Sequence, residues 1–193
     1  FYRTDFIRQL VVDRESSAGS LLLKPLDGKS YANSLQVDVR YPVLRNLDVT
    51  LAWRHNDVRQ TIGGQLLEKP YTSRYKGLFT VNYTTNLKKW MFDYTLQLNG
   101  GGRLPHTMGQ GTDVYATSPA EFPAYTVMNA QITRYFRYWS LYAGAENFTG
   151  FMQDDPVLGA SDPFGPGFDA TNIWGPVMGR RIHAGIRFTL NYN

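Results

Sequence analysis

The fold is decided by the last stretch of the chain, which reads Arg181-Ile182-His183-Ala184-Gly185-Ile186-Arg187-Phe188-Thr189-Leu190-Asn191-Tyr192. Taken in steps of two, its apolar residues fall on one face, and its polar residues, with one glycine, fall on the other. Because successive side chains of a strand point to opposite faces, this pattern predicts a strand with one apolar and one polar side. At roughly 3.3 Å per residue the stretch extends about 40 Å, and a tilted strand crosses a bilayer with roughly 9 to 11 residues. Length and alternation therefore predict a membrane-spanning β-barrel strand.

The composition of the 193 residues is compatible with this prediction. Hydrophobic residues make up 42% of the chain and the mean hydropathy is −0.36. Such values are typical of soluble proteins and also of outer-membrane barrels, in which only alternate strand residues face lipid. No apolar run reaches the roughly 18 residues of a transmembrane helix. The 13 Tyr, 11 Phe and 4 Trp, together with 18 Gly and 10 Pro, favour a β protein with long turns.

Several function classes lose support from the sequence. The chain has no Cys, which excludes a disulfide framework, a thiolate metal site and a Cys nucleophile. Its formal charge is +4, but the basic residues are scattered singly, so we predict no nucleic-acid partner. No Ser/His/Asp set is indicated, so we predict neither an enzyme nor a cofactor. His55, His106 and His183 lack metal-ligand spacing. Five loop carboxylates also lack EF-hand spacing and are interpreted as solvated: Asp113, Asp154, Asp155, Asp162 and Asp169.

Seven further segments show the same long alternation. They cover residues 1–12, 31–41, 47–55, 71–84, 88–99, 124–134 and 138–148. The connections after the second, fourth and sixth segments are short, whereas the others are long and polar. Outer-membrane barrels combine short periplasmic turns with long extracellular loops in this way. The N-terminus lacks the apolar core and cleavage site of a signal peptide, so we expect either a removed signal or a piece of a larger polypeptide.

Aromatic residues gather near the short turns of this pattern. Amphipathic rings at such positions form a girdle at the headgroup level of a membrane. The predicted membrane-interface aromatics are Tyr41, Tyr83, Trp90, Trp139 and Tyr192. In the alternative interpretation, a soluble β protein, Trp90 and Tyr94 would belong to the core and the loops would form the surface.

Five stretches of the sequence carry a family resemblance. They are Leu67-Glu68-Lys69-Pro70, Gly100-Gly101-Gly102-Arg103-Leu104-Pro105, Gly144-Ala145-Glu146-Asn147-Phe148-Thr149, Phe168-Asp169-Ala170 and the segment from Ile173 to Phe188. They resemble the C-terminal end of TonB-dependent outer-membrane receptors, and most closely the group related to SusC-type transporters. The segment from Trp174 to Phe188 is the most specific part of the likeness.

The resemblance implies an all-β fold in which residues 1–193 form the last part of a roughly 22-stranded antiparallel transmembrane barrel. A plug domain and the earlier strands would lie upstream, outside this sequence. The implied function is TonB-dependent active uptake of a scarce, bulky ligand such as a glycan, peptide, metal chelate or corrinoid. Implied partners are the lipid of a Gram-negative outer membrane, the TonB complex through the absent N-terminal part, and a surface lipoprotein lid.

Polar side chains on the inward face of the predicted strands suit a water-filled or plug-filled lumen. These lumen-facing candidates are Asp38, Arg40, Asp48, Arg54, Arg74, Asp93, Gln97, Glu146 and Arg187. Aromatic residues of the longest loop are candidates for a ligand vestibule: Phe151, Phe164, Phe168 and Trp174. Polar lining and loop packing are the alternative roles for these two sets.

One alternative from another functional class stays open. Eight strands can also close a small, self-contained outer-membrane barrel with a structural or adhesive role. In such a barrel the first and last strands would pair with each other, because lipid leaves an unpaired strand edge without hydrogen-bond partners.

Overall fold

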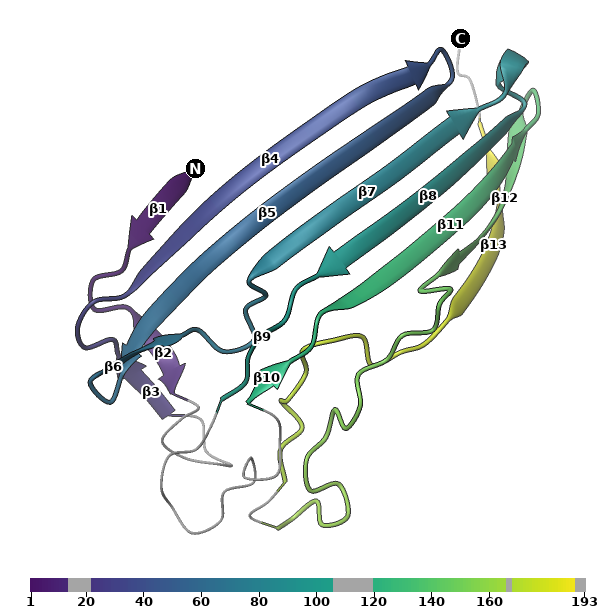
Figure 1. The fold of residues 1–193 in the computed structure, drawn as a ribbon. Coiled ribbons are helices and arrows are strands. Elements are labelled where there is room, and N and C mark those ends of the chain that lie inside the picture. The colour runs from purple at the N-terminus through teal and green to yellow at the C-terminus, as the bar shows by residue number, and fades with distance from the viewer. Residues whose placement is uncertain (14–21, 106–119, 166–167, 190–193) are drawn as a thin grey trace.

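The computed structural model describes residues 1–13, 22–105, 120–165 and 168–189. Eight antiparallel strands lie side by side in one sheet (Figure 1). In spatial order they are β1 (Tyr2–Asp5), β4 (Tyr31–Leu44), β5 (Leu47–Ile62), β7 (Tyr75–Thr84), β8 (Trp90–Asn99), β11 (Tyr125–Tyr135), β12 (Trp139–Glu146) and β13 (Arg181–Phe188). The predicted all-β wall of about eight antiparallel strands is confirmed.

The remaining elements are short. β6 (Gln65–Glu68) pairs with the end of β5, β2 (Leu10–Asp13) pairs with β3 (Leu22–Pro25), and β9 (Gly102–Arg103) pairs with β10 (Glu121–Phe122). One 3-10 turn, η1 (Asn86–Lys88), lies between β7 and β8. Among the described residues, no helix is long and apolar enough to cross a membrane.

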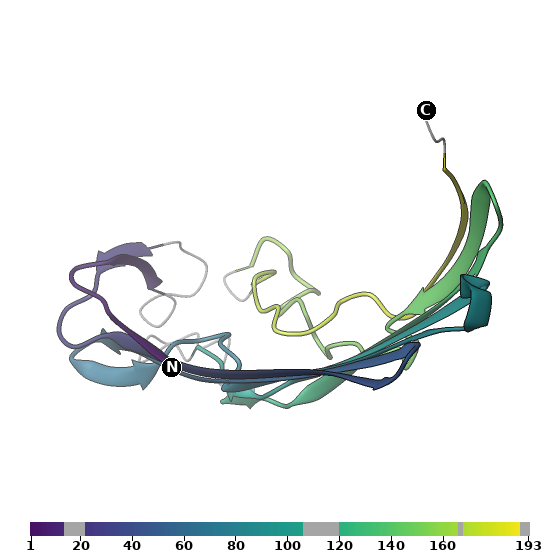
Figure 2. The same ribbon diagram turned by 90° about the horizontal axis from the view of Figure 1, so that it is seen from above.

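The sheet is curved and open. Figure 2 shows it as a trough, with parts of the connection between β12 and β13 lying on the concave side. Within the described ranges, β1 pairs only with β4 and β13 only with β12, and no ladder joins β1 to β13. The ladder that a self-contained eight-stranded barrel requires is therefore not seen.

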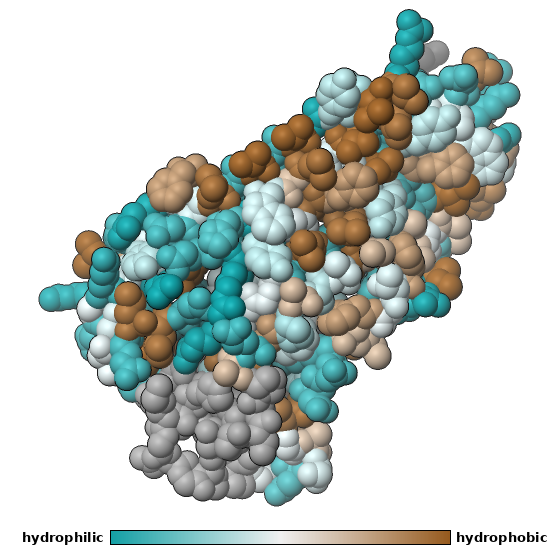
Figure 3. Space-filling view, in the orientation of Figure 1, coloured by the Kyte–Doolittle hydropathy of each residue, from teal (hydrophilic) through white to brown (hydrophobic). Residues whose placement is uncertain are grey.

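The strand register places the apolar residues on one face of the sheet. Val39 pairs with Leu51, Leu51 with Phe79, Phe79 with Leu96, and Leu96 with Met128, which forms an apolar row across five strands. Leu51 keeps 53% of its surface exposed. Figure 3 shows apolar side chains spread over this face of the strands. A contiguous exposed apolar surface of this kind marks a membrane or partner contact.

The opposite face carries polar rows. Arg54 lies opposite Lys76, Asn82 opposite Asp93, and Asp93 opposite Gln131. Polar side chains of β8, β11 and β13 line a pocket together with residues 176–179 of the last long connection. Figure 2 shows parts of that connection on the concave side of the sheet. The polar face is therefore concave and the apolar face convex.

The connections between strands alternate in length, as the sequence predicts. Residues 45–46, 85–89 and 136–138 make the short turns after β4, β7 and β11, at the upper right of Figure 1. Backbone hydrogen bonds close them, for example from Phe136 N to Trp139 O at 2.8 Å. All the long connections lie at the other end of the strands.

The first predicted strand is wrong in its extent. Residues 1–12 are broken after Asp5, and β2 pairs with β3 instead of continuing beside β4. Arg8 lies at the break with a φ of 51°, a left-handed conformation that interrupts an extended chain. The same residue interrupts the apolar face in the sequence.

The long connection predicted between the segments 47–55 and 71–84 is also wrong in part. β5 continues to Ile62 and turns back into β6 through Gly63 and Gly64, whose φ values are 58° and 78°. Two consecutive left-handed residues make a tight hairpin turn, for which glycine is the favoured residue. The strands predicted to begin at residues 71 and 88 begin at Tyr75 and Trp90. The C-terminal strand, predicted over residues 181–192, ends at Phe188.

Gly185 on the concave face provides a test of this packing. A Cβ at Gly185 would overlap the ring and hydroxyl of Tyr142, its cross-strand partner on β12. We expect Gly185→Val to destabilise the barrel of the native polypeptide by roughly 1–3 kcal/mol through overpacking. The measurement is the temperature at which the folded barrel unfolds, read from its heat-dependent migration on a gel. The double variant Tyr142→Ser/Gly185→Val should recover part of the loss, and an unchanged unfolding temperature for the single variant would contradict the packing.

Candidate functional site: the concave face and its loops

Eight of the nine lumen-facing candidates lie on strands, on the polar side of the sheet. They are Asp38 and Arg40 on β4, Asp48 and Arg54 on β5, Asp93 and Gln97 on β8, Glu146 on β12 and Arg187 on β13. The ninth, Arg74, directly precedes β7. The structure does not gather them into one cluster; they are spread across the width of the sheet.

Most of the candidates are paired locally. Arg40 and Asp48 lie 3.6 Å apart, and Asp93 accepts a 2.6 Å hydrogen bond from Asn82. Arg54 donates to Ser34 Oγ at 2.9 Å and also contacts the Tyr2 hydroxyl. Exposed ion pairs of this kind contribute little to folding stability. The pairing makes the concave face polar without giving it a large net charge.

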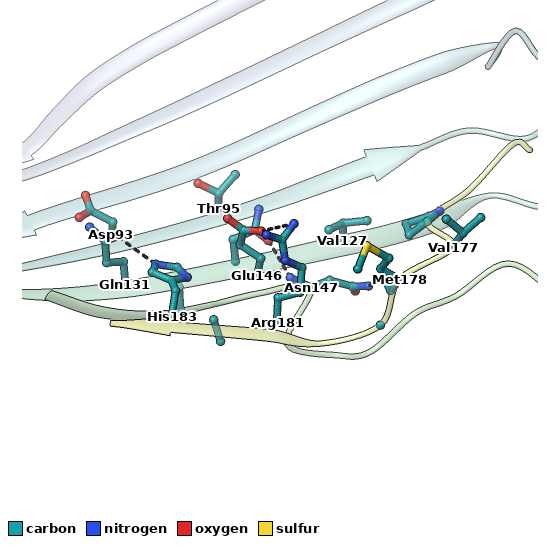
Figure 4. Close-up of a pocket in the computed structure, with 15 residues that line it drawn as sticks. Asp93, Thr95, Val127, Gln131, Glu146, Asn147, Val177, Met178, Arg181 and His183 are labelled. Carbon is teal, nitrogen blue, oxygen red and sulfur yellow. Dashed lines mark hydrogen bonds and ion pairs between the residues drawn. The ribbon is translucent and has the colours of Figure 1, made fainter. Parts of the chain in front are cut away.

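A pocket of about 550 Å³ opens on the concave face beside the last strands. Figure 4 shows its lining side chains, which come from β8, β11, β12 and β13 and from the end of the preceding connection. Glu146 and Arg181 face each other at 3.6 Å, and His183 Nε2 lies 3.3 Å from Gln131 Oε1. Met178 adds an apolar side. The pocket therefore offers carboxylates, a guanidinium, an imidazole and a thioether.

The buried Gln153 fixes the long connection between β12 and β13. Its side-chain oxygen accepts hydrogen bonds from Trp174 N at 2.8 Å and Gly175 N at 3.0 Å, while its amide group donates to Asn172 O. Only 5% of Gln153 is exposed. Three backbone groups of residues 172–175 thus depend on one side chain.

Asn147, at the exit of β12, joins the same connection to the wall. Its backbone N–H donates to Asn129 Oδ1 on β11 at 2.8 Å, and its side-chain amide donates to Phe151 O and Met178 O. Asn147 has a φ of 46°, a left-handed conformation that Asn tolerates better than most residues. Both ends of the connection therefore meet at one residue.

Two of the predicted vestibule aromatics pack against the wall. Phe151 stacks on Tyr125 with ring centroids 4.9 Å apart, and Trp174 stacks on Phe122 at 5.6 Å. Tyr125 also donates its hydroxyl to Trp174 O at 3.1 Å. The other two lie farther along the loop: Phe164 is fully exposed and Phe168 is half-buried. Of these four candidates, only Phe164 presents a fully exposed ring.

Arg74 joins two segments at the loop end of the strands. Its guanidinium binds Glu68 at 2.8 Å and Glu121 at 2.9 Å. Its hydrogen bonds to Glu121 and Glu68 raise the pKa of Arg74, and the hydrogen bond from Arg74 holds the pKa of Glu121 below its ordinary value. Because the pKa of Glu121 is lower in the folded state, the interaction with Arg74 contributes to folding stability at pH values above the ordinary carboxyl pKa. This contribution to stability is lost as the pH falls through the lowered pKa.

The membrane-interface candidates lie near the short turns. Tyr41 and Tyr83 are exposed, while Trp90 and Trp139 begin β8 and β12 and are partly covered. The rings of Phe136 and Trp139 stack with centroids 3.9 Å apart. Tyr192 lies outside the described residues.

The part of the chain that the structure describes holds no group of three His, Cys, Asp or Glu residues able to bind a metal. His106 and Asp113 are outside it. Sequence reasoning missed the residues that fix the loops, above all Gln153, Asn172 and Tyr125. A single Gln, Asn or Tyr in a polar connection carries no periodic signal, so nothing in the sequence could have assigned these contacts.

The Gln153 contacts predict a measurable change in backbone protection. In Gln153→Ala, the amides of residues 174 and 175 lose their acceptor, and we expect their hydrogen exchange to rise by about tenfold or more. Gln131→Ala is a matched control, because Gln131 lies on the same face but bonds no backbone of the connection. Hydrogen exchange followed by mass spectrometry of the native polypeptide checks the effect. Equal exchange in the two variants would be inconsistent with it.

The Arg74 pairs predict a second change in protection. The amides of residues 71 and 74 donate to Arg103 O and Gly101 O, each at 3.0 Å, beside the Arg74 ion pairs. In Arg74→Gln we expect exchange at these amides to rise roughly three- to tenfold, as for a partly exposed ion-pair network. Arg59→Gln, which breaks the neighbouring pair with Asp57, should leave them unchanged. Unaltered exchange in Arg74→Gln would show that the pairs do not hold these segments.

Comparison with known proteins bears on the fold. No protein-family model matches the sequence, and no curated protein is significantly similar to it. Solved structures do match. A point mutant of the ferric enterobactin receptor PfeA from Pseudomonas aeruginosa superposes with a TM-score of 0.61 at 14% identity, covering 95% of this chain and 27% of the receptor. A second mutant of that receptor, in complex with enterobactin, superposes with a TM-score of 0.61 at 15% identity. The match covers 95% of this chain and 28% of the receptor.

The chain thus spans little more than a quarter of the length of the receptors it matches. At this level of identity the likeness concerns the fold alone. The fold of this chain is that of a portion of the β-barrel of TonB-dependent outer-membrane receptors.

Proposed function

We propose that this chain is the C-terminal part of the barrel wall of a TonB-dependent transporter in a Gram-negative outer membrane. The observation that carries the proposal is the division of one antiparallel sheet into an apolar convex face and a polar concave face. The match of 95% of the chain to ferric enterobactin receptor structures supports it. The transported solute is a scarce, bulky ligand such as a glycan, peptide, metal chelate or corrinoid.

In this proposal the convex face contacts lipid. The row from Val39 to Met128 is apolar on every strand it crosses, so it replaces water contacts with acyl chains at no polar cost. The free edges of β1 and β13 pair with neighbouring strands of the rest of the barrel. Those pairs give the edge N–H and C=O groups the partners that lipid cannot supply.

The concave face contacts the plug domain and the water around it. The spread of paired charges, such as Arg40–Asp48 and Glu146–Arg181, suits a surface that must stay hydrated and release what it touches. The nine lumen-facing candidates are proposed to act as such a lining and not as one binding site. Energy from the inner-membrane TonB complex acts through the N-terminal part of the whole receptor, which this sequence does not include.

The long connections form the extracellular mouth. The contacts of Gln153, Asn147 and Trp174 hold the last connection against the wall, so its tip with Phe164 is presented above the lumen. An exposed ring there provides a stacking surface for a bulky ligand. A surface lipoprotein that covers this mouth is part of the proposal through the SusC-type resemblance.

Uptake by cells tests the proposal. Cells with and without the gene are supplied with radiolabelled ferric enterobactin, cyanocobalamin or an oligosaccharide, each with and without a protonophore. We expect accumulation of one probe class that requires both the gene and the proton gradient. Phe164→Ala should lower accumulation at limiting probe concentration several-fold, while Phe1→Ala, also at an exposed aromatic, should not.

The self-contained barrel gives different results. It would show no energy-dependent uptake of any probe, and its intact polypeptide would have a mass near 22.0 kDa. A mass several times larger, measured by denaturing mass spectrometry of purified outer membranes, is expected for the transporter.

A further inference from the structure

The short-turn end of the sheet carries an uncompensated positive charge. Residues 45–46, 85–89 and 136–138 contain basic side chains and no Asp or Glu, and one more Arg lies two residues before the third turn. We call these residues the rim cluster: Arg45, Lys88, Lys89, Arg134 and Arg137. In the described part of the chain, none of the five pairs with a carboxylate. This contrasts with the paired charges of the concave face.

Arg134 differs from the other members because it lies on the convex face. It is opposite Trp90 on β8 and Leu141 on β12, in the register of the apolar rows. Its guanidinium lies over the Trp90 ring, 4.6 Å from the centroid, and 5.5 Å from the centroid of Phe136. An arginine is thus held between two rings on the surface that faces lipid.

An arginine at this position favours a nearby anion. The guanidinium stays charged in proteins, so it does not adapt to lipid by losing a proton. A lipid-facing charge is tolerated near the interface and costly toward the midplane. Stacking on an aromatic face uses the flat side of the guanidinium and leaves its N–H edge free for the bidentate hydrogen bonds that a phosphate accepts.

The neighbouring turns supply more positive charge around the same point. The backbone of Lys89 accepts a hydrogen bond from Tyr135 N at 2.8 Å, so the turn between β7 and β8 lies against the end of β11. Arg137 lies over the Tyr138 ring at 5.1 Å in the next turn. Each basic residue near a bilayer surface favours a negatively charged headgroup over a zwitterionic one.

We propose that Arg134, between Trp90 and Phe136, binds the phosphate of an anionic phospholipid in the inner leaflet, with Lys88, Lys89 and Arg137 around it. The inner leaflet is assigned because short turns face the periplasm and the long loops face outward. This inference rests on the proposed function only for the placement of the convex face in lipid. It does not depend on which ligand is transported.

Native mass spectrometry of the full-length native polypeptide tests the site. The detergent-solubilised barrel is titrated with equimolar dioleoyl phosphatidylglycerol and dioleoyl phosphatidylethanolamine. We expect the wild type to retain phosphatidylglycerol preferentially, and Arg134→Gln to lower that retention by about tenfold or more. Trp90→Leu, which keeps an apolar side chain but removes the ring, should lower it by a smaller factor.

Two control variants separate this site from general charge effects. Arg40→Gln removes an arginine from the same end of the wall but from the concave face, so phosphatidylglycerol retention should stay at the wild-type level. Arg134→Lys keeps the charge but loses the planar fork, so it should fall between wild type and Arg134→Gln. Heat-dependent gel migration confirms that each variant forms a folded barrel.

The outcomes distinguish this inference from the proposed function. Equal retention of the two lipids by wild type, or wild-type retention by a folded Arg134→Gln variant, overturns the lipid site while leaving transport untouched. Preferential retention in a protein that shows no energy-dependent uptake supports the site and removes the transport proposal. A polypeptide that does not insert into vesicles of these two lipids contradicts both.

Discussion

Backbone N–H and C=O groups inside a bilayer have no water to bind, so neighbouring strands must satisfy all of them. In this wall the pairing of β4 with β5 is continuous from Tyr31–Arg59 to Pro42–Asp48, and the interior strands are paired on both sides. Directly opposed residues share a face, so the register places the apolar residues of neighbouring strands on the same side of the sheet. The separation of an apolar convex face from a polar concave face follows from this register.

The long strands could be predicted because alternation is a local property that each segment shows without its partners. The strand ends that could not be predicted depend on pairing between segments that are distant in the sequence. Arg8 ends the first segment because β2 finds a partner in β3, which no local pattern indicates. β5 continues past Asn56, where the apolar residues Val58 and Ile62 fall on the face opposite to Leu51 and Trp53, so the alternation of the first half of the strand does not continue.

In the candidate site too, local patterns could be predicted and contacts between distant residues could not. Face assignment placed eight lumen-facing candidates on the polar side, but their pairing partners depend on the registers between strands. The contacts of Gln153 join residues about twenty positions apart in a connection without regular structure. The family resemblance included the stretches that contain Asn147 and Trp174, which fix this connection to the wall, and it was most specific from Trp174 to Phe188. The resemblance indicated the region of the chain, whereas the role of each side chain depends on contacts that only the folded structure brings together.

The alternation of short and long connections also affects how the wall assembles. Three hairpins, β4–β5, β7–β8 and β11–β12, are closed by turns of a few residues, so their ladders form at a small loss of chain entropy. The ladders β5–β7, β8–β11 and β12–β13 must close longer connections, and in the last of these a long polar segment must also dock on the wall. We therefore expect the wall to form from preassembled hairpins that join at the long-loop seams, with β12–β13 among the last to close.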